Sequence, residues 1–207
     1  MSSNRPFFTS FIVLFVVVCV YLTRVDLPFS RNDMDAGTSI PIEVSLSTDV
    51  AEDSIFGSVK IHITLTNTSP KDLYILRWSS PLDSHVPAMG VVTFTSTKTG
   101  DVAPCLNMKV GHRMPASGFF SPDDQSIMYV RAHGKLDGVM EFKEPEVALV
   151  KGEEYSAKAT GRWMGVWTAE AGQKVEKLLV NDDMRIGEFE SNQVIVRVAG
   201  ADGTELM

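Results

Sequence analysis

The sequence contains few of the residues that mark disulfide-rich or nucleic-acid-binding proteins. Only 2 of its 207 residues are cysteine, which excludes a disulfide scaffold. Lysine and arginine number 19 against 26 aspartates and glutamates, so the formal net charge is -7, and no basic block interrupts the chain. Because phosphate backbones are bound by clustered positive charge, we expect no nucleic-acid partner. The composition, 44% hydrophobic and 22% charged, is that of a globular domain.

Recognisable catalytic motifs are absent as well. No histidine is followed by glutamate, which excludes the H-E-x-x-H helix of zinc proteases. The chain has no C-x-x-C pair, no G-x-S-x-G elbow, no Walker loop and no G-x-G-x-x-G. Adjacent acids such as Asp123-Asp124 are typical of a solvated surface. We therefore expect a protein that is not an enzyme, with no catalytic residue and no resident cofactor.

The longest apolar run lies at the N-terminus. Residues 6–22 carry no charge and rise about 25 Å as a helix, slightly less than a hydrocarbon core of about 30 Å. An uncleaved signal anchor, a cleaved signal peptide and a buried core helix all fit this run. Its end lacks the A-x-A pattern of a cleavage site, which favours the anchor. We expect residues 1–22 to be a signal anchor or signal peptide that contacts the membrane through residues 6–22, followed by a stalk at residues 23–38. The domain is then lumenal or extracellular, or secreted if the helix is cleaved.

Beyond the stalk, the hydrophobic pattern has a period of two. Apolar and polar residues alternate from Ile40 to Leu46 and again from Val59 to Leu65, as in strands with one buried face. Further strand-like runs cover residues 73–78, 91–97, 105–110, 125–130, 138–142, 155–159 and 193–198. Helical periodicity is scarce, and residues 169–180 are its best case. The pattern predicts an all-β sandwich or barrel over residues 39–200, with residues 201–207 as a tail.

Histidines and methionines suggest one metal-binding alternative. His112 and Met114 are two residues apart, so they share a face of a strand, and His85 and Met89 lie upstream. Imidazole and thioether groups are ligands that suit Cu(I). The set is similar to that of periplasmic copper chaperones of cupredoxin-like fold, although their complete His/Met spacing is absent. Core and surface roles for these residues are the competing interpretation.

Three further features have a structural and a functional interpretation. Trp163 and Trp167 are four residues apart, and they either pack in the core or form an exposed pair that binds a partner. Cys105 is the single cysteine outside the apolar run, so it is either buried or a free thiol able to pair between chains. Asn67 begins the glycosylation sequon Asn-Thr-Ser, which Pro70 follows directly.

Residues 58–83 resemble part of a known family. The stretches SVKIHITLTNTS (58–69) and LYILRWSSPLD (73–83) resemble the pro-domain of fungal deuterolysin-type and peptidyl-Lys zinc metalloendopeptidases. Residues 110–115 and 149–153 are similar to later turns of that pro-domain, so the likeness extends over residues 40–160. The catalytic domain is absent, and no catalytic residue carries over. The resemblance implies an immunoglobulin-like antiparallel β-sandwich, here preceded by one N-terminal hydrophobic helix, that covers or assists a protease.

Two main functional hypotheses follow, and a hydrolase with an unrecognised site is a third. The first is a non-enzymatic binding module, inhibitor-like or chaperone-like, whose partner is another protein such as a secreted metalloprotease. Its expected contact residues are Arg77, Trp78, Asp83, Trp163 and Trp167. The alternative is a copper(I)-binding domain of cupredoxin-like fold. Its expected ligands are His85, Met89, His112 and Met114.

Overall fold

The alternating segments of the sequence form strands in the computed structural model, which describes residues 39–48, 57–180 and 184–199. Within these residues the elements are β1 (Ile42–Ser47), β2 (Val59–Asn67), β3 (Asp72–Leu76), α2 (Val86–Met89), β4 (Val92–Ser96), β5 (Phe119–Phe120), β6 (Ile127–Val130), β7 (Lys135–Phe142), β8 (Glu154–Ala169), β9 (Leu178–Leu179) and β10 (Arg185–Arg197). The predicted all-β class is confirmed. The predicted N-terminal helix, the stalk and the C-terminal tail lie outside the described residues.

Strand β2 shows how period-two patterning produces the fold. Its inward residues Ile61, Ile63 and Leu65 are fully buried, whereas Lys60, which points to the other face of the strand, is exposed. The strand pairs antiparallel with β1 on one side and with β7 on the other, which satisfies the backbone groups along both of its edges. A one-residue slip would turn the buried side chains to solvent, so the hydrophobic pattern fixes the register.

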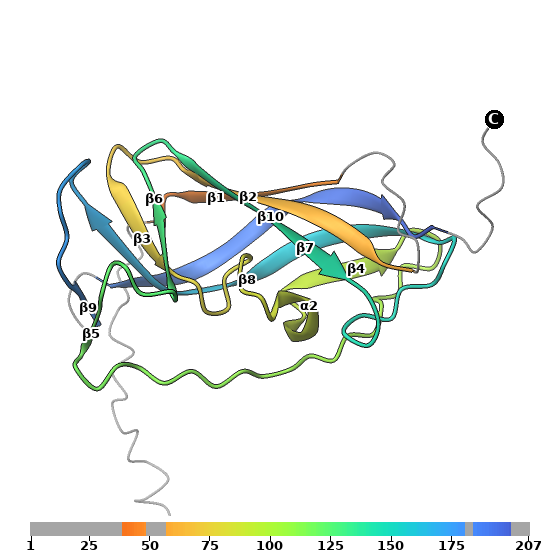
Figure 1. Cartoon of the computed structure of the whole chain (residues 1–207). Coiled ribbons are helices and arrows are strands. Elements are labelled where there is room, and N and C mark those ends of the chain that lie inside the picture. Colours follow the sequence, from red (N-terminus) through yellow and green to blue (C-terminus); the bar gives the residue numbers. More distant parts are fainter. Residues whose placement is uncertain (1–38, 49–56, 181–183, 200–207) are drawn as a thin grey trace, which may run out of the picture. The chain divides into compact units, whose positions relative to one another are not determined.

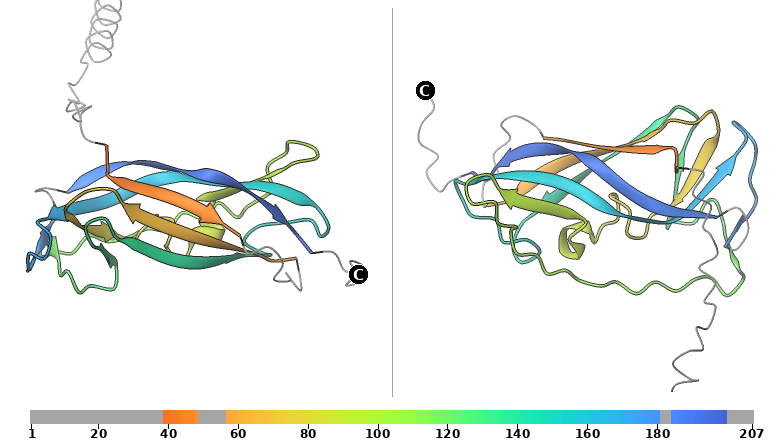
Figure 2. Two further views of the ribbon diagram at one scale, coloured as in Figure 1. Left: turned by 90° about the horizontal axis from the view of Figure 1, so that it is seen from above. Right: turned by 180° about the vertical axis from the view of Figure 1, so that it is seen from behind.

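The strands surround one core from two sides. The main sheet has the order β6-β3-β8-β10-β1-β2-β7, and β4 also pairs with β8. In Figure 1, β1 and β2 run along the upper part of the domain, β8 runs below them, and β7 slants from the top of the domain down towards β4. The views from above and from behind show the same arrangement, with the long strands β8 and β10 running through the domain (Figure 2). This arrangement is a β-sandwich whose layers are joined through β10.

A bulge in β10 makes that connection. The pairing of β10 with β8 is interrupted between Glu190 and Gln193, and at this point β10 pairs parallel with β1. The side chain of Asn192 accepts a hydrogen bond from the N–H of Leu46 (2.7 Å) and donates one to the Leu46 carbonyl (3.0 Å). The Asn192 amide thus takes the place of a strand partner, so no backbone group of Leu46 is left unpaired.

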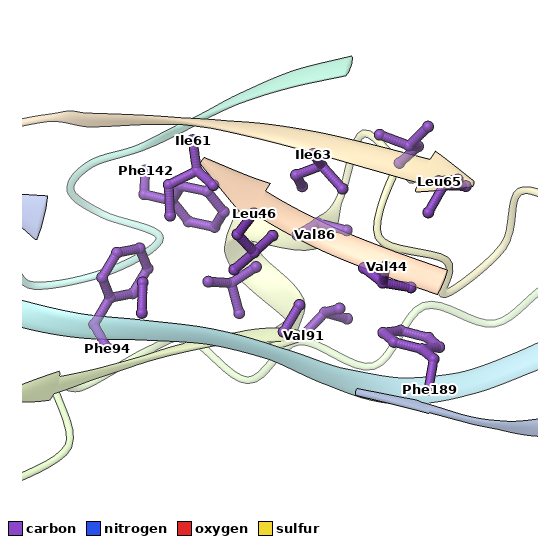
Figure 3. Close-up of a cluster of buried hydrophobic side chains, with 14 of the residues drawn as sticks. Val44, Leu46, Ile61, Ile63, Leu65, Val86, Val91, Phe94, Phe142 and Phe189 are labelled. Carbon is purple, nitrogen blue, oxygen red and sulfur yellow. The ribbon is translucent and has the colours of Figure 1, made fainter. Parts of the chain in front are cut away.

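Buried side chains from both layers meet in the middle. Figure 3 shows Leu46 and Ile61 on the side of Phe94 of β4, and Val44 next to Phe189 of β10 at the other end of the view. A second, smaller cluster lies where β3 and β8 approach β5 and β9. Its buried members are Tyr74, Leu76, Phe120, Ile127, Trp167, Ala169 and Leu178. The second cluster supports the region that carries the candidate site.

Two predicted elements are wrong. Residues 105–110 form no strand, because beyond an isolated bridge between Cys105 and Val147 this chain segment leaves the sheet. Residues 169–180 contain no helix; after β8 ends at Ala169 the chain turns at Gly172 (φ 76°) and enters β9. Among the described residues, no helix is long and apolar enough to cross a membrane, and residues 6–22 are not among them.

Candidate functional site

The loop between β3 and α2, residues 77–85, is built from consecutive turns. The N–H of Ser80 donates to the Arg77 carbonyl (3.0 Å), and the N–H of Asp83 donates to the Ser80 carbonyl (3.1 Å). Ser79 adopts a left-handed conformation (φ 56°) between them. This loop, called the 77–85 loop below, carries four of the predicted site residues. They are Arg77, Trp78, Asp83 and His85.

Asp83 organises the 77–85 loop from within. Its buried carboxylate accepts hydrogen bonds from the backbone N–H groups of Ser79 (2.9 Å) and His85 (3.0 Å), and from Nδ1 of His85 (2.9 Å). Burial opposes ionisation, but these donors outweigh it and hold the pKa of Asp83 below its usual value. Because the carboxylate is occupied by its own loop, the structure gives Asp83 a structural role in place of the expected partner contact.

Arg77 ties the loop to a neighbouring segment. Its Nη1 donates to the Leu82 carbonyl (3.3 Å) and its Nε donates to the Gln125 carbonyl (3.4 Å). The side chain is half-buried, so part of the guanidinium remains at the surface. Arg77 therefore stabilises the loop through these hydrogen bonds and also places a positive charge at its surface edge.

Trp78 lies at the border of the second cluster. It is half-buried, and its ring meets the edge of the Phe120 ring at a centroid distance of 5.5 Å. Its other contact is the ring of His112, which is stacked at 4.4 Å with the planes 5° apart. Trp78 thus connects the core to a segment that is far away in the sequence.

The other two tryptophans belong to the core. Trp163 is 1% exposed and packs against Phe189 at a ring distance of 4.7 Å, and Trp167 is 3% exposed. The indole N–H of Trp167 donates to the Leu179 carbonyl (2.7 Å). They also belong to different clusters, so the expectation of an exposed aromatic pair is corrected: both residues pack the domain.

The segment that follows the β4 hairpin, residues 103–118, is called the strap. Its first half is tied to the domain, since Leu106 N–H donates to the Glu146 carbonyl (3.0 Å) and Met108 N–H to the Ala88 carbonyl (2.8 Å). Its far end is tied where Val180 N–H donates to the Gly118 carbonyl (3.0 Å). Between these points, residues 109–114 make no backbone hydrogen bond to the described part of the chain. Figure 1 shows the strap running along one side of the fold.

The strap exposes apolar side chains. Ten large hydrophobic residues are exposed among those described; three of them lie in the strap and a fourth, Val102, lies directly before it. They are Val102 (61% exposed), Leu106 (57%), Met108 (40%) and Met114 (40%). Lys109 and Arg113 are exposed on the same segment. The strap therefore combines exposed apolar and basic side chains on one segment, and periodicity did not reveal it.

A cavity of about 330 Å³ adjoins the strap. Its walls include Pro87 of α2, Met108 of the strap, and the carboxylate-bearing residues Glu141 and Glu146. Oε2 of Glu146 is buried and has no hydrogen-bond partner among the described residues. Lys143 also belongs to the wall, so the cavity lining carries charges of both signs.

The structure places the four expected copper ligands in different surroundings. Three of them contact other residues, and the fourth is exposed on the strap. The ring of His85 contacts a carboxylate of its own loop, and the ring of His112 lies on Trp78. Met89 packs against the main core, whereas Met114 is exposed on the strap. Among the residues with described positions, no group of three or more His, Cys, Asp or Glu side chains can hold a metal ion. The copper(I) site remains a prediction.

Asn67 is corrected from a glycosylation site to a structural residue. It is 1% exposed, and its Nδ2 donates to the carbonyls of Lys71 (2.7 Å) and Arg131 (2.9 Å). Its Oδ1 accepts hydrogen bonds from the N–H (2.9 Å) and hydroxyl (2.8 Å) of Ser69. A sugar on Nδ2 would displace these contacts, so the folded domain cannot carry it at this position.

Cys105 lies at the start of the strap as a half-buried free thiol. Its Sγ is 3.6 Å from the Pro87 carbonyl and 3.7 Å from the Ala88 carbonyl, distances that fit weak S–H hydrogen bonds. The thiol therefore packs the strap against α2 while it is only half-buried, and pairing between chains stays a prediction.

Comparison with known proteins agrees with this architecture. The sequence model of the immunoglobulin-like domain matches residues 44–198. An uncharacterized secreted protein of Arthroderma benhamiae is 26% identical over 163 residues, which cover 78% of this chain and 79% of the relative. Among solved structures, PapD-like domain 7 of human CEP192 is similar at 12% identity and a TM-score of 0.32, over 79% of this chain and 89% of that one. This last likeness is distant.

Proposed function

The chain belongs to the immunoglobulin-like domain family, and from this membership we propose that it is an extracellular, non-catalytic domain that binds another protein. The proposed contact face consists of the strap and the 77–85 loop. The secreted relative from Arthroderma benhamiae supports the extracellular location. The proposal is compatible with both a membrane-tethered and a freely secreted protein, since both present the same domain outside the cytoplasm.

The exposed apolar side chains of the strap carry the proposal. Leu106, Met108 and Met114 are each at least 40% exposed, and the cationic residues Lys109 and Arg113 lie between and beside them. Apolar side chains that gather at the surface mark interaction sites in soluble proteins, and here three of them lie on one short segment. Methionine is well suited to such a surface because its flexible thioether adapts to a partner's shape.

The backbone of the strap offers a second mode of contact. Residues 109–114 have free N–H and C=O groups within the described structure, so an edge strand of a partner can pair with them. Backbone pairing supplies affinity with little dependence on sequence, and the adjacent side chains supply specificity. The stacked rings of Trp78 and His112 hold the strap at one place during this encounter.

The arrangement around His85 supports a non-catalytic role. Asp83 and His85 form the carboxylate–imidazole half of a triad, with Nδ1 bonded to the carboxylate. A nucleophile would have to contact Nε2, whereas the hydroxyl of Ser84 lies 3.5 Å from Nδ1. Among the described residues the pair makes contacts within its own loop and stabilises the turn before α2.

The resemblance of residues 58–83 to metalloprotease pro-domains suggests the first partner to test. Residues 77–83 of that stretch form most of the 77–85 loop, which Asp83 organises and which positions Trp78 against the strap. We therefore propose a secreted zinc metalloprotease as partner, with the chain acting as a pro-domain-like inhibitor. A chaperone-like action on the same partner uses the same face.

The test is a binding titration with the full chain immobilised. The analytes are an inactivated deuterolysin-type zinc metalloprotease and, for comparison, an unrelated secreted serine protease. Leu106→Ser, Met108→Ser and Met114→Ser combined should weaken metalloprotease binding at least ten-fold. The control Val139→Ser removes an equally exposed apolar side chain from β7 and should leave binding unchanged. Equal binding of both analytes, or full binding by the triple variant, contradicts the proposal.

A further inference from the structure

We propose that the strap is a site of proteolytic processing, cut after Lys109 or Arg113 by an endoprotease specific for basic residues. The product is a two-chain protein that stays assembled. This inference goes beyond partner binding and does not depend on it, because it concerns the covalent state of the chain itself.

The segment has the conformation that proteases require. An endoprotease binds its substrate as an extended strand, so the target must free several residues from their hydrogen bonds. Residues 109–114 already lack backbone hydrogen bonds within the described structure, and all of them except half-buried Val110 are exposed. Neither Lys109 nor Arg113 is followed by proline; the next residues are Val110 and Met114. The substrate conformation thus exists in the folded protein, without local unfolding.

The other basic residues lie in shorter or more tightly held segments. Lys98 lies in a hairpin turn closed by the bond from Gly100 N–H to the Ser96 carbonyl (2.9 Å). Lys174 and Lys177 lie in the β8–β9 loop, whose residues 174–177 also make no backbone hydrogen bond in the described structure. That loop is held at its start, where Gly172 N–H donates to the carboxylate of Asp72 (2.9 Å), and near its end, where Lys177 lies over the Phe119 ring. The unpaired stretch of the strap is longer, so we expect the protease to cut the strap first.

The reaction is a simple hydrolysis. At the second position, water adds to the carbonyl carbon of Arg113 and the bond from this carbon to the nitrogen of Met114 breaks. Arg113 keeps the new carboxylate, and Met114 takes up a proton and becomes an N-terminal ammonium. No oxidant, reductant or cofactor is consumed.

The two halves remain joined because the cut separates strands that pair with each other. The N-terminal part holds β1 to β4, and the C-terminal part holds β5 to β10. Five pairings cross the cut: β1 with β10, β2 with β7, β3 with β6, β3 with β8, and β4 with β8. The main core draws on both parts. The strap's own ends are tied at Met108 and Gly118, outside the cleaved stretch.

Cleavage changes the surface near Trp78. His112 lies between the two cut positions and contributes its ring to the stack on Trp78. After cleavage at both positions, the fragment that carries His112 is no longer covalently held, and one face of Trp78 becomes accessible. Processing thereby converts an intramolecular contact into an exposed aromatic surface.

Limited digestion of the native full chain with trypsin tests the inference. Within residues 39–207, the first cuts seen by mass spectrometry should follow Lys109 and Arg113, and the two halves should co-elute in size-exclusion chromatography. Lys109→Gln combined with Arg113→Gln should slow the loss of the intact domain at least ten-fold. The matched control Lys174→Gln with Lys177→Gln should leave the rate unchanged. A first cut at another site, or separation of the halves without denaturant, overturns the proposal.

Discussion

The imidazole of His112 lies flat on the indole of Trp78, with centroids 4.4 Å apart and planes 5° from parallel. His112 is exposed, whereas Trp78 is half-buried and touches Phe120 in the second cluster. The stack is therefore the point where the otherwise unpaired middle of the strap contacts the folded domain. It determines how freely the strap moves, and with it how the candidate face is presented.

Removing this stack should loosen the strap without unfolding the domain. An aromatic pair contributes roughly 0.5–1.5 kcal/mol, and one partner here is exposed. We expect His112→Ala to lower the free energy of unfolding by less than about 1 kcal/mol. Trypsin cleavage in the strap should become several-fold faster. His112→Phe keeps a flat ring on Trp78 and should behave like the wild type. Equal cleavage rates for the alanine variant and the wild type would show that the stack does not restrain the strap.

A second prediction concerns the close packing of Gly161 against Phe189. A Cβ added at Gly161 would come within 2.6 Å of the Phe189 ring, which is itself packed on Trp163. Gly161→Ala should therefore lower stability by about 1–3 kcal/mol through overpacking. Gly111→Ala is the matched control, because a Cβ there meets no atom within 4 Å. Urea denaturation of both variants gives the comparison, and equal midpoints would refute the packing described for β8 and β10.

The third prediction tests the structural role of Asn67. Asn67→Ala leaves the carbonyls of Lys71 and Arg131 without their donor and should cost about 2–3 kcal/mol. Wild-type protein secreted from a eukaryotic host should carry no glycan on Asn67. Urea denaturation measures the first effect and peptide mass mapping the second. A folded, secreted protein with a sugar at this position would contradict the buried amide.

A fourth prediction follows from the carboxylate of Asp72. It accepts hydrogen bonds from the N–H groups of Gly172 (2.9 Å) and Ala132 (2.8 Å) and from the hydroxyl of Tyr129 (2.8 Å). The N–H groups of Gly172 and Ala132 are the main cause of a pKa below the usual value. A lowered folded-state pKa stabilises the protein above the unfolded-state pKa, near 3.9, and this contribution is lost as the pH falls through the folded-state value.

Replacing this carboxylate should expose that pH dependence. Asp72→Asn should lower the free energy of unfolding by about 1–3 kcal/mol at pH 7. The difference between variant and wild type should shrink as the pH falls below about 3.9. Urea denaturation at a series of pH values between 7 and 3 measures both. A difference that is constant across this range would mean that the carboxylate charge contributes nothing.

The sequence predicts the layers of this domain better than its connections. Alternation along Ile40–Leu46 and Val59–Leu65 predicts β1 and β2 because each strand has one buried and one solvated face. β8 extends to Ala169, well beyond the predicted 155–159, because it crosses from the main core into the second cluster. Its pattern of buried residues therefore changes along its length, and a simple period-two analysis ends too early.

The candidate site was predicted only in part. The 77–85 loop could be found from its turn residues, and Trp78 does lie at the surface border of that loop. The strap could not be found in this way, because Leu106 and Met108, which suggested a strand at 105–110, are exposed here. Burial of Trp163, Trp167 and Asn67 depends on contacts made by distant segments, which spacing in the sequence does not reveal.

Hydrogen–deuterium exchange on the native full chain tests the central claim most directly: the middle of the strap is unpaired and available to a partner. Amides of residues 110–114 should exchange within seconds, at nearly the rate of an unfolded peptide, whereas those of residues 157–159 in β8 should be protected by many orders of magnitude. Addition of the binding partner should slow exchange in the strap. Strong protection of residues 110–114 in the free protein would contradict the account.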